Sequence, residues 1–372
     1  MWRRVLTALA LAAVVLAAGC LGSLPGLGER RGDVVPPAIV PVEGAAPVET
    51  PVYTFPFGDG EETVRIEPDP AVYAGAKAAD RQLYLRKDLA EEEWIPIYYL
   101  AFANDPHQEP FYADLLAALR GIRDREGLDD DRYLELIAAF VQSIPYETDA
   151  SMMEPKFPIE TYMDAEGDCD DKSLLLAALL AREGYGVALL YFGEEEHMAV
   201  GVKSAGCRYR NTTYAYIETT NGSYVGILPA TLTDGTILSS DPLVIPVGDG
   251  KRSYTACEEI ETIERALSAS RDRVEELEEE LAVRTRALET DRAALAALDA
   301  RMADLSRSGK IREYNRLVPE YNRMAGDYND AVAAYNAILH EVEAAVNLHN
   351  HLAGHTHDRP GSYLLAREYL AG

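Results

Sequence analysis

A heptad repeat in the last third of the chain restricts the possible folds most. Apolar residues recur every seven positions from Ile260 onward, with further apolar residues three positions after several of them. A second series of the same kind begins at Tyr314, after a short run at 306–310 that contains a glycine. Such a repeat is typical of helices that pack along one seam. The sequence therefore predicts an antiparallel coiled-coil hairpin over residues 257–352.

The hairpin region raises two possibilities for binding. Its second half repeats a Tyr-Asn pair, which is either packing seam with a polar flank or a binding stripe for a partner protein. The end of the hairpin and the expected C-terminal tail, 353–372, carry closely spaced histidines, which either bind zinc or nickel or form a polar helix end. These histidines are His349, His351, His355 and His357.

The N-terminal residues 1–20 have the pattern of an export signal, with two arginines, an apolar run and small residues before Cys20. The sequence Leu-Ala-Ala-Gly-Cys resembles the lipobox of prokaryotic lipoproteins, which implies that Cys20 carries lipid at the outer face of the cell membrane. Ordinary secretion and an uncleaved anchor are the alternatives. Residues 21–51 are rich in Pro, Gly and Ala and predict a semi-extended tether.

The charge of the chain limits its partners. There are 35 Lys and Arg against 62 Asp and Glu, a formal net charge of −27. A surface this acidic repels phosphate backbones, so we expect no nucleic-acid partner.

Residues 52–256 predict an α+β domain. A strand or hairpin is expected over 52–66, followed by a helical lead-in at 71–89, 93–102, 110–125 and 132–143. A further helix begins at Cys169, and strands are expected at 187–192, 197–203 and 209–219.

The motif Gly167-Asp-Cys-Asp-Asp-Lys-Ser places a thiol among carboxylates. Asp168 suits the N-cap of the helix that begins at Cys169, and Asp170 and Asp171 suit its first turn. A helix N-terminus is one of the environments that lower the pKa of a cysteine, so we expect an activated thiol here. The same acidic run raises the possibility of a calcium ion near Asp168, Asp170 and Asp171, although no EF-hand spacing is present.

A base and an orienting group for this thiol are also available. Within residues 21–339 the histidines are His107, in an expected loop, and His197, which opens a strand. Glu218 ends the next expected strand, so helix and strands can bring Cys169, His197 and Glu218 to one edge of the domain. A carboxylate on an imidazole fixes its tautomer, which predicts a catalytic triad. Asn221 is a second candidate for the orienting group.

Residues 130–232 resemble the transglutaminase-like cysteine protease superfamily, particularly its archaeal members. The resemblance rests on Phe-Pro-Ile-Glu-Thr at 157–161, the Gly-Asp-Cys motif, His-Met-Ala-Val-Gly-Val at 197–202 and Tyr-Ile-Glu-Thr-Thr at 216–220. It implies a papain-like core in which a helix carrying the cysteine packs on an antiparallel sheet. It also implies that Cys169 is the nucleophile, His197 the general acid and base, and Glu218 the orienting residue, with no cofactor required.

The resemblance predicts a thiol enzyme that acts on amide bonds of a protein or peptide through a thioester, as a peptidase or as a transamidase. Two positions depart from the family, since many relatives have Asp in place of Glu218 and a tryptophan in place of Ala199. Gln142 is a candidate oxyanion donor, or else a polar group on an exposed helix face. The alternative to an enzyme is an inactive adaptor that docks a partner on the hairpin.

The remaining cysteines suggest one disulfide. If Cys20 is lipidated and Cys169 stays free, Cys207 and Cys257 are left as a pair in an oxidising compartment. Cys207 lies between two expected strands and Cys257 just ahead of the first heptad. The predicted bond would tie the root of the hairpin to the sheet.

Overall fold

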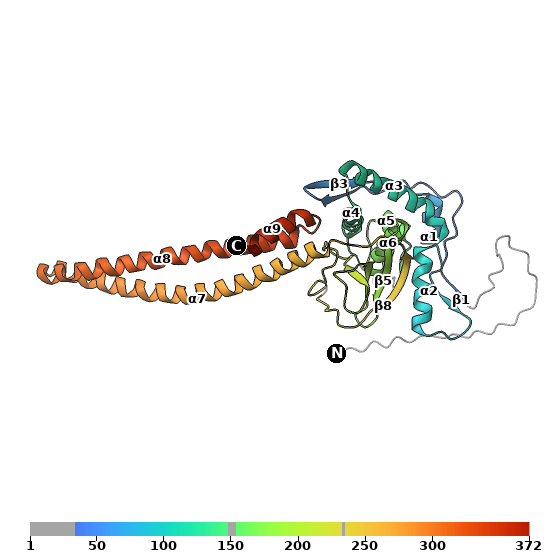
Figure 1. Cartoon of the computed structure of the whole chain (residues 1–372). Coiled ribbons are helices and arrows are strands. Elements are labelled where there is room, and N and C mark those ends of the chain that lie inside the picture. Colours follow the sequence, from blue (N-terminus) through green and yellow to red (C-terminus); the bar gives the residue numbers. More distant parts are fainter. Residues whose placement is uncertain (1–33, 148–153, 233–234, 372) are drawn as a thin grey trace, which may run out of the picture.

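The computed structural model describes residues 34–147, 154–232 and 235–371, so the expected signal segment, Cys20 and the first part of the tether lie outside the described residues. It consists of a body of helices around an antiparallel sheet and a long helical arm that projects from one side of it (Figure 1). The predicted α+β class is confirmed. Within the part of the chain that is described, no helix combines the length and the apolar character required to cross a bilayer.

The central sheet has four antiparallel strands in the order β7-β6-β5-β8. The strands are β5 (Gly186–Phe192), β6 (His197–Lys203), β7 (Tyr214–Ile217) and β8 (Leu243–Asp249). Strand β7 is shorter than the expected 209–219 because the Thr212 hydroxyl donates to the carbonyl of Tyr209, 2.7 Å away, and closes a turn there. Strand β8 was not predicted from the sequence.

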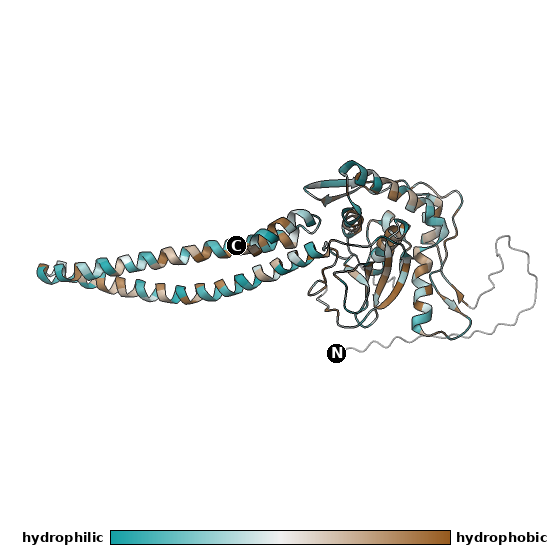
Figure 2. Ribbon diagram, in the orientation of Figure 1, coloured by the Kyte–Doolittle hydropathy of each residue, from teal (hydrophilic) through white to brown (hydrophobic). Residues whose placement is uncertain are grey.

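Helix α6 (Cys169–Arg182) packs on one face of this sheet. Its apolar residues from Leu174 to Leu180 have no solvent exposure, and the strand residues beneath them are equally buried. Figure 2 shows the same concentration of apolar residues in the strands at the centre of the body. This tight packing fixes the start of α6 relative to the first residues of β6.

The helices that precede α6 largely occupy the ranges expected for the lead-in, except for the short 3-10 helix and the helix at 158–164, which were not expected. They are α1 (Pro70–Lys77), α2 (Glu91–Ala103), the short 3-10 helix Pro106–Gln108, α3 (Glu109–Glu126), α4 (Asp130–Gln142) and α5 (Pro158–Asp164). The hairpin expected over 52–66 is present as β2 (Tyr53–Phe57) and β3 (Gly60–Val64). The helix expected over 71–89 ends early, because the Asp80 carboxylate accepts the N–H of Gln82 and forms a turn.

The prediction of a tether is wrong for residues 34–42, which pack on the body. Strand β1 (Val34–Val35) pairs with β4 (Tyr84–Leu85). Ile39 is buried, and its N–H donates to the buried Asp105 carboxylate 2.8 Å away. A Cβ at Gly75 would lie 2.4 Å from the carbonyl oxygen of Val40, so glycine at this position permits the close approach.

The arm is the predicted antiparallel hairpin, formed by α7 (Cys257–Arg307) and α8 (Ile311–Gly354). A helix of 51 residues is roughly 75 Å long at 1.5 Å per residue. The segment expected as a tail is a third helix, α9 (Arg359–Ala371), which folds back and packs mainly on α7 (Figure 1). A turn after α8 brings these residues back to the body, so they form part of the root of the arm.

Three kinds of bond hold the root of the arm, which we define as Cys257 and Glu259 of α7 together with residues 352–362 around the α8–α9 turn. The predicted disulfide joins Cys207 to Cys257, the first residue of α7. Arg359 is 5% exposed and pairs with Glu135 of α4 and with Glu259 of α7. The Tyr224 hydroxyl donates to the carbonyl of Leu352 at 2.8 Å and lies 2.7 Å from the Ser362 hydroxyl.

Candidate active site

Cys169 is the first residue of α6, as predicted, and Asp168 is its N-cap. One carboxylate oxygen of Asp168 accepts the N–H groups of Asp170 and Asp171, at 3.0 and 3.1 Å. A Cβ at Gly167 would lie 2.8 Å from the Cβ of Asp171, which explains why the smallest residue precedes the cap. The Gly-Asp-Cys motif is thus a tight helix start that places the thiol at the edge of the body.

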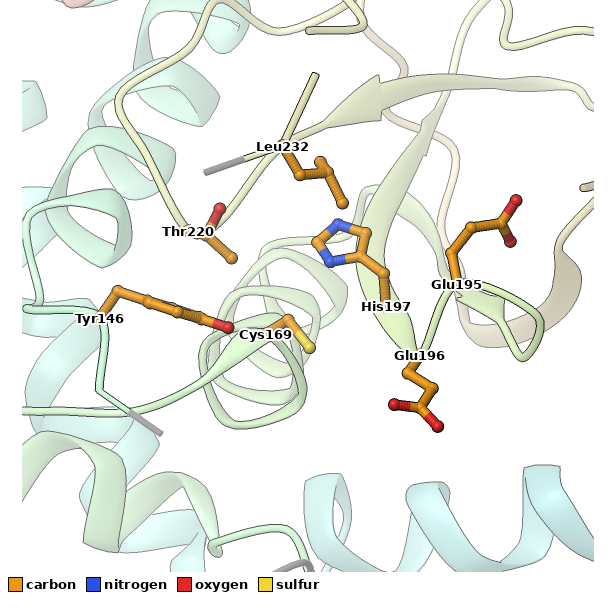
Figure 3. Close-up of a pocket in the computed structure, with 7 residues that line it drawn as sticks. All are labelled: Tyr146, Cys169, Glu195, Glu196, His197, Thr220 and Leu232. Carbon is orange, nitrogen blue, oxygen red and sulfur yellow. The ribbon is translucent and has the colours of Figure 1, made fainter. Parts of the chain in front are cut away.

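The Cys169 thiol and the His197 imidazole line the same pocket, which has a volume of about 130 Å³. Figure 3 shows the two side chains reaching the pocket from different elements, the N-terminus of α6 and the start of β6. The pocket is lined by Tyr146, Cys169, Glu195, Glu196, His197, Thr220 and Leu232. The arrangement brings a thiol and an imidazole into one concave site.

Glu218 lies behind His197, as expected from the sequence. One of its carboxylate oxygens, Oε2, is 3.4 Å from Nε2 of the imidazole, and both side chains are buried. The hydroxyl of Tyr216 donates to the same Oε2 at 2.6 Å and lies 3.3 Å from Nε2. With Nε2 directed at the carboxylate, Nδ1 is the ring nitrogen left for the thiol.

The second oxygen of Glu218 is held by the chain that follows β7. It accepts the N–H groups of Thr219 and Thr220, both at 2.9 Å, and the Thr220 hydroxyl at 2.8 Å. Burial acts to raise the pKa of Glu218, but the hydrogen bond and charge of His197, with the hydrogen bonds of Tyr216 and Thr220, lower it to about 2. The residue is therefore a fixed carboxylate at neutral pH.

The expected activation of the thiol is not present in this arrangement. Burial raises the pKa of the Cys169 thiol well above its ordinary value, and the carboxylates of Asp170 and Asp168 raise it further. The Met198 backbone N–H acts in the opposite direction. The thiol lies 3.6 Å from an oxygen of Asp170, so the acidic neighbour acts on it at short range and adds to the effect of burial.

The three acidic residues around the thiol serve the protein's own groups. Asp170 accepts the Tyr99 hydroxyl at 2.9 Å, and burial, together with the charge of Asp168, raises its pKa to about 6. Asp171 accepts the N–H of Lys156 at 2.6 Å, and burial and Asp168 raise its pKa to about 7. The carboxylate oxygens considered for calcium thus cap the helix or accept hydrogen bonds from neighbouring residues.

Gln142 does not point at the pocket as an oxyanion donor. Its side-chain amide donates to the carbonyl oxygens of Glu218, at 2.8 Å, and Ser223, at 3.1 Å, so it supports the segment that carries the orienting carboxylate. Asn221 is exposed on that segment, while Glu218 takes the position beside His197.

Lys172 is a buried cation close to the site, and the sequence analysis did not assign it a role. Its ammonium group donates to the carbonyls of Gln142 and Ile144, at 3.2 and 2.5 Å, at the C-terminal end of α4. Burial lowers the pKa of Lys172 to about 8, against the opposing effect of Glu218. Lys172 therefore joins α6 to the end of α4 from which Gln142 reaches the segment that carries Glu218.

Tyr216 was also missed, although the sequence contained a signal for it. Alternate residues of a strand share a face, so a tyrosine two positions before Glu218 is expected on the same side of the sheet.

Glu195 was missed as well. Its carboxylate accepts the N–H and hydroxyl groups of Ser239 and Ser240, which joins the β5–β6 turn to the loop before β8.

The C-terminal histidines divide into His349, which lies apart, and a row of neighbouring rings formed by His351, His355 and His357, with His355 and His357 5.7 Å apart between centroids. His349 lies in the arm seam beside Ser270 and the carbonyl of Leu267, while the rings of His351 and His355 stack with centroids 4.0 Å apart. Across residues 34–147, 154–232 and 235–371 no group of three His, Cys, Asp or Glu side chains could hold a metal ion.

Comparison with known proteins gives no relative for this chain: no family model, no curated protein and no solved structure matches it. The geometry of the site and the motifs of the sequence are therefore the basis for the function proposed below.

Proposed function

We propose that this chain is a transglutaminase-like thiol enzyme that acts on amide bonds of a protein or peptide. The observation that carries the proposal is the shared pocket of Cys169 and His197, with the imidazole held from behind by Glu218. These are three residue types competent for nucleophilic catalysis, arranged as nucleophile, base and orienting group. The papain-like core is part of the same proposal, supported by the helix that carries the cysteine and packs on an antiparallel sheet.

In the proposed reaction His197 removes the proton of the Cys169 thiol as the sulfur attacks the carbonyl carbon of the amide. In the first turn of α6 the Asp168 cap accepts the N–H groups of Asp170 and Asp171, which leaves the N–H of Cys169 as the candidate donor for the developing oxyanion. The imidazolium then gives its proton to the amine, the C–N bond breaks, and a thioester on Cys169 remains. Attack by water completes hydrolysis, whereas attack by a second amine completes transamidation.

The raised pKa of the thiol favours a second candidate, an inactive adaptor that binds partners through the arm. Because burial raises the pKa of Cys169, the thiol rests neutral on either account. The enzyme differs in that proton transfer to His197 must accompany attack, so its thiol reactivity depends on the histidine.

We also propose that the protein works outside the cytoplasm, anchored through lipid on Cys20. The disulfide between Cys207 and Cys257 supports this location, since such bonds persist in oxidising compartments. The arm leaves the body on the side opposite to α2 and β1, where the described chain begins (Figure 1). An anchored protein would then direct its arm away from the point of attachment, toward a substrate or a partner protein.

The test is covalent labelling of the purified protein with a low concentration of an acyloxymethyl ketone probe. We expect labelling of Cys169, a loss of at least about 100-fold in rate for His197→Ala, and a smaller loss for Glu218→Gln. His107→Ala is the matched control, because His107 is a half-exposed residue of the short 3-10 helix and does not line the pocket, so the change should leave the rate unchanged. Equal labelling of the wild type and His197→Ala would leave the adaptor as the remaining candidate.

A further inference from the structure

We propose that Tyr216 is a positioning residue of the candidate active site, so that this chain uses a Cys-His-Glu site supported by a tyrosine. The hydroxyl of Tyr216 is 2.6 Å from Oε2 of Glu218 and 3.3 Å from Nε2 of His197, and Tyr216 is 1% exposed. It therefore contacts both the base, His197, and the carboxylate of Glu218 that orients it. The proposal rests on the function proposed above, because it assigns a role within the same site.

The position of Tyr216 follows from the pairing of β6 with β7. Tyr216 stands opposite Gly201, and His197, Ala199 and Gly201 lie on one face of β6 because alternate residues share a face. On this face, which is turned away from the main core, a second buried cluster contains Tyr216. Its members are Leu190, Phe192, Ala199, Tyr209, Tyr216 and Leu238.

This packing gives a physical account of the departure at Ala199. Many members of the family that the sequence resembles have tryptophan two positions after the histidine, and here that position is a small residue with no exposed surface. Ala199 and the ring of Tyr216 belong to the same cluster, so a large side chain at 199 would need space that the cluster has already filled. The small side chain of Ala199 on β6 thus leaves the space that the ring of Tyr216 on β7 fills.

The hydroxyl has an electrostatic effect as well as a steric one. By donating to Oε2, Tyr216 takes up part of the negative charge that would otherwise act on the imidazolium of His197. The other ionisable groups around the ring are Cys169 and Asp170 on α6, Glu195 and Glu196 in the turn before β6, and Glu218 after β7. Without the hydroxyl, the full carboxylate charge acts on His197, and the protonated imidazole persists to higher pH.

The test compares Tyr216→Phe with Tyr209→Phe in the full chain. Tyr209 is the matched control, because its ring is 5.7 Å from that of Tyr216 in the same cluster and its buried hydroxyl has no hydrogen-bond partner. Nitrogen-15 NMR of labelled histidine follows the tautomer and titration of His197, and the ketone probe follows the pH dependence of thiol labelling. Neither variant introduces a new polar group, and both keep the ring.

We expect Tyr216→Phe to move the titration midpoint of His197 to higher pH by at least about 0.5 unit and to slow labelling at pH 7 by about tenfold. Tyr209→Phe should match the wild type in both measurements. Identical titration of His197 in all three proteins overturns the role of Tyr216. If the midpoint moves while no protein is labelled at Cys169, the positioning role stands and the proposed enzymatic function fails.

Discussion

The body and the arm solve the same packing problem in different ways. In the body, the apolar residues of α6 from Leu174 to Leu180 have no exposed surface, because helices and a sheet enclose them. In the arm, two helices pack along a single seam, and most heptad residues stay half-buried. These include Leu281, Leu288, Leu295, Tyr314, Tyr321, Tyr328 and Tyr335. A fully enclosed core can hold catalytic side chains to a fixed geometry, whereas a two-helix seam provides length.

The root of the arm is where these two regions meet, and it lies close to the candidate site in the chain. The segment that begins with Glu218 also contains Thr220, which lines the pocket, and Tyr224, which contacts α8 and α9. The orienting carboxylate and the anchor of the arm are thus only a few residues apart. The first two predictions below test whether the buried bonds of the root stabilise the protein. The third concerns a buried carboxylate of the body.

The largest effect is expected from removing the disulfide with Cys207→Ser and Cys257→Ser together. The bond closes a loop of 50 residues, so its loss should lower the free energy of unfolding of the body by about 4 kcal/mol on the chain-entropy estimate. Chemical denaturation of wild type and double variant measures the difference. A change below about 1 kcal/mol would mean that the other root contacts hold the arm on their own.

A smaller effect is expected from Arg359→Ala, about 3 kcal/mol, because the change leaves Glu135 buried with fewer donors. Arg132 still pairs with Glu135 at 2.7 Å, which keeps the cost at the lower end for a buried pair. Arg273→Ala is the control on the shaft of the arm, where an exposed arginine pairs with Glu276 and Glu341. Its cost should be far smaller than that of Arg359→Ala, because exposed ion pairs contribute little to stability. Equal costs at both sites would remove the distinction between the root and the rest of the arm.

The smallest effect concerns the pH dependence of stability. The pKa of Asp170 rises from 3.8 to about 6 on folding, so the folded state binds its proton more tightly. Stability from this group therefore increases as the pH falls from about 7 to about 4, by on the order of 2 kcal/mol. Asp170→Asn should remove this contribution to the pH dependence of stability over that range. The amide oxygen of the asparagine can still accept the Tyr99 hydroxyl.

Asp327→Asn is the matched control for this measurement, because Asp327 is an exposed arm residue paired with Arg323. Its thermal unfolding profile between pH 4 and pH 7 should run parallel to that of the wild type. If the profile of Asp170→Asn also runs parallel to that of the wild type, the carboxyl group of Asp170 does not have the raised pKa described here.

Much of this structure follows from local sequence signals. The heptads predict the two helices of the arm, and Asp168 before an apolar helical run predicts the start of α6 at Cys169. Cysteine counting predicts the disulfide. Each of these depends on residues that lie near one another in the sequence or on a small number of possible pairs.

Features that depend on distant segments were missed. Residues 34–42 pack on the body because Gly75 has no side chain to block the carbonyl of Val40. The C-terminal helix packs at the root because Arg359 pairs there with Glu135. The raised pKa of Cys169 arises from burial, which a motif does not reveal. Tyr216 is an intermediate case, because strand alternation places it beside Glu218 but does not show that its hydroxyl reaches His197.

The central claim, that His197 enables Cys169 to form a thioester, is tested most directly by trapping that intermediate. Reaction with p-nitrophenyl acetate, acid quench and peptide mass mapping would report the acyl group on Cys169. We predict an adduct that forms within one turnover and then decays by hydrolysis in the wild type, and almost none in His197→Ala at the same time point. An adduct that forms equally in both proteins, or on neither, would contradict the proposed enzyme.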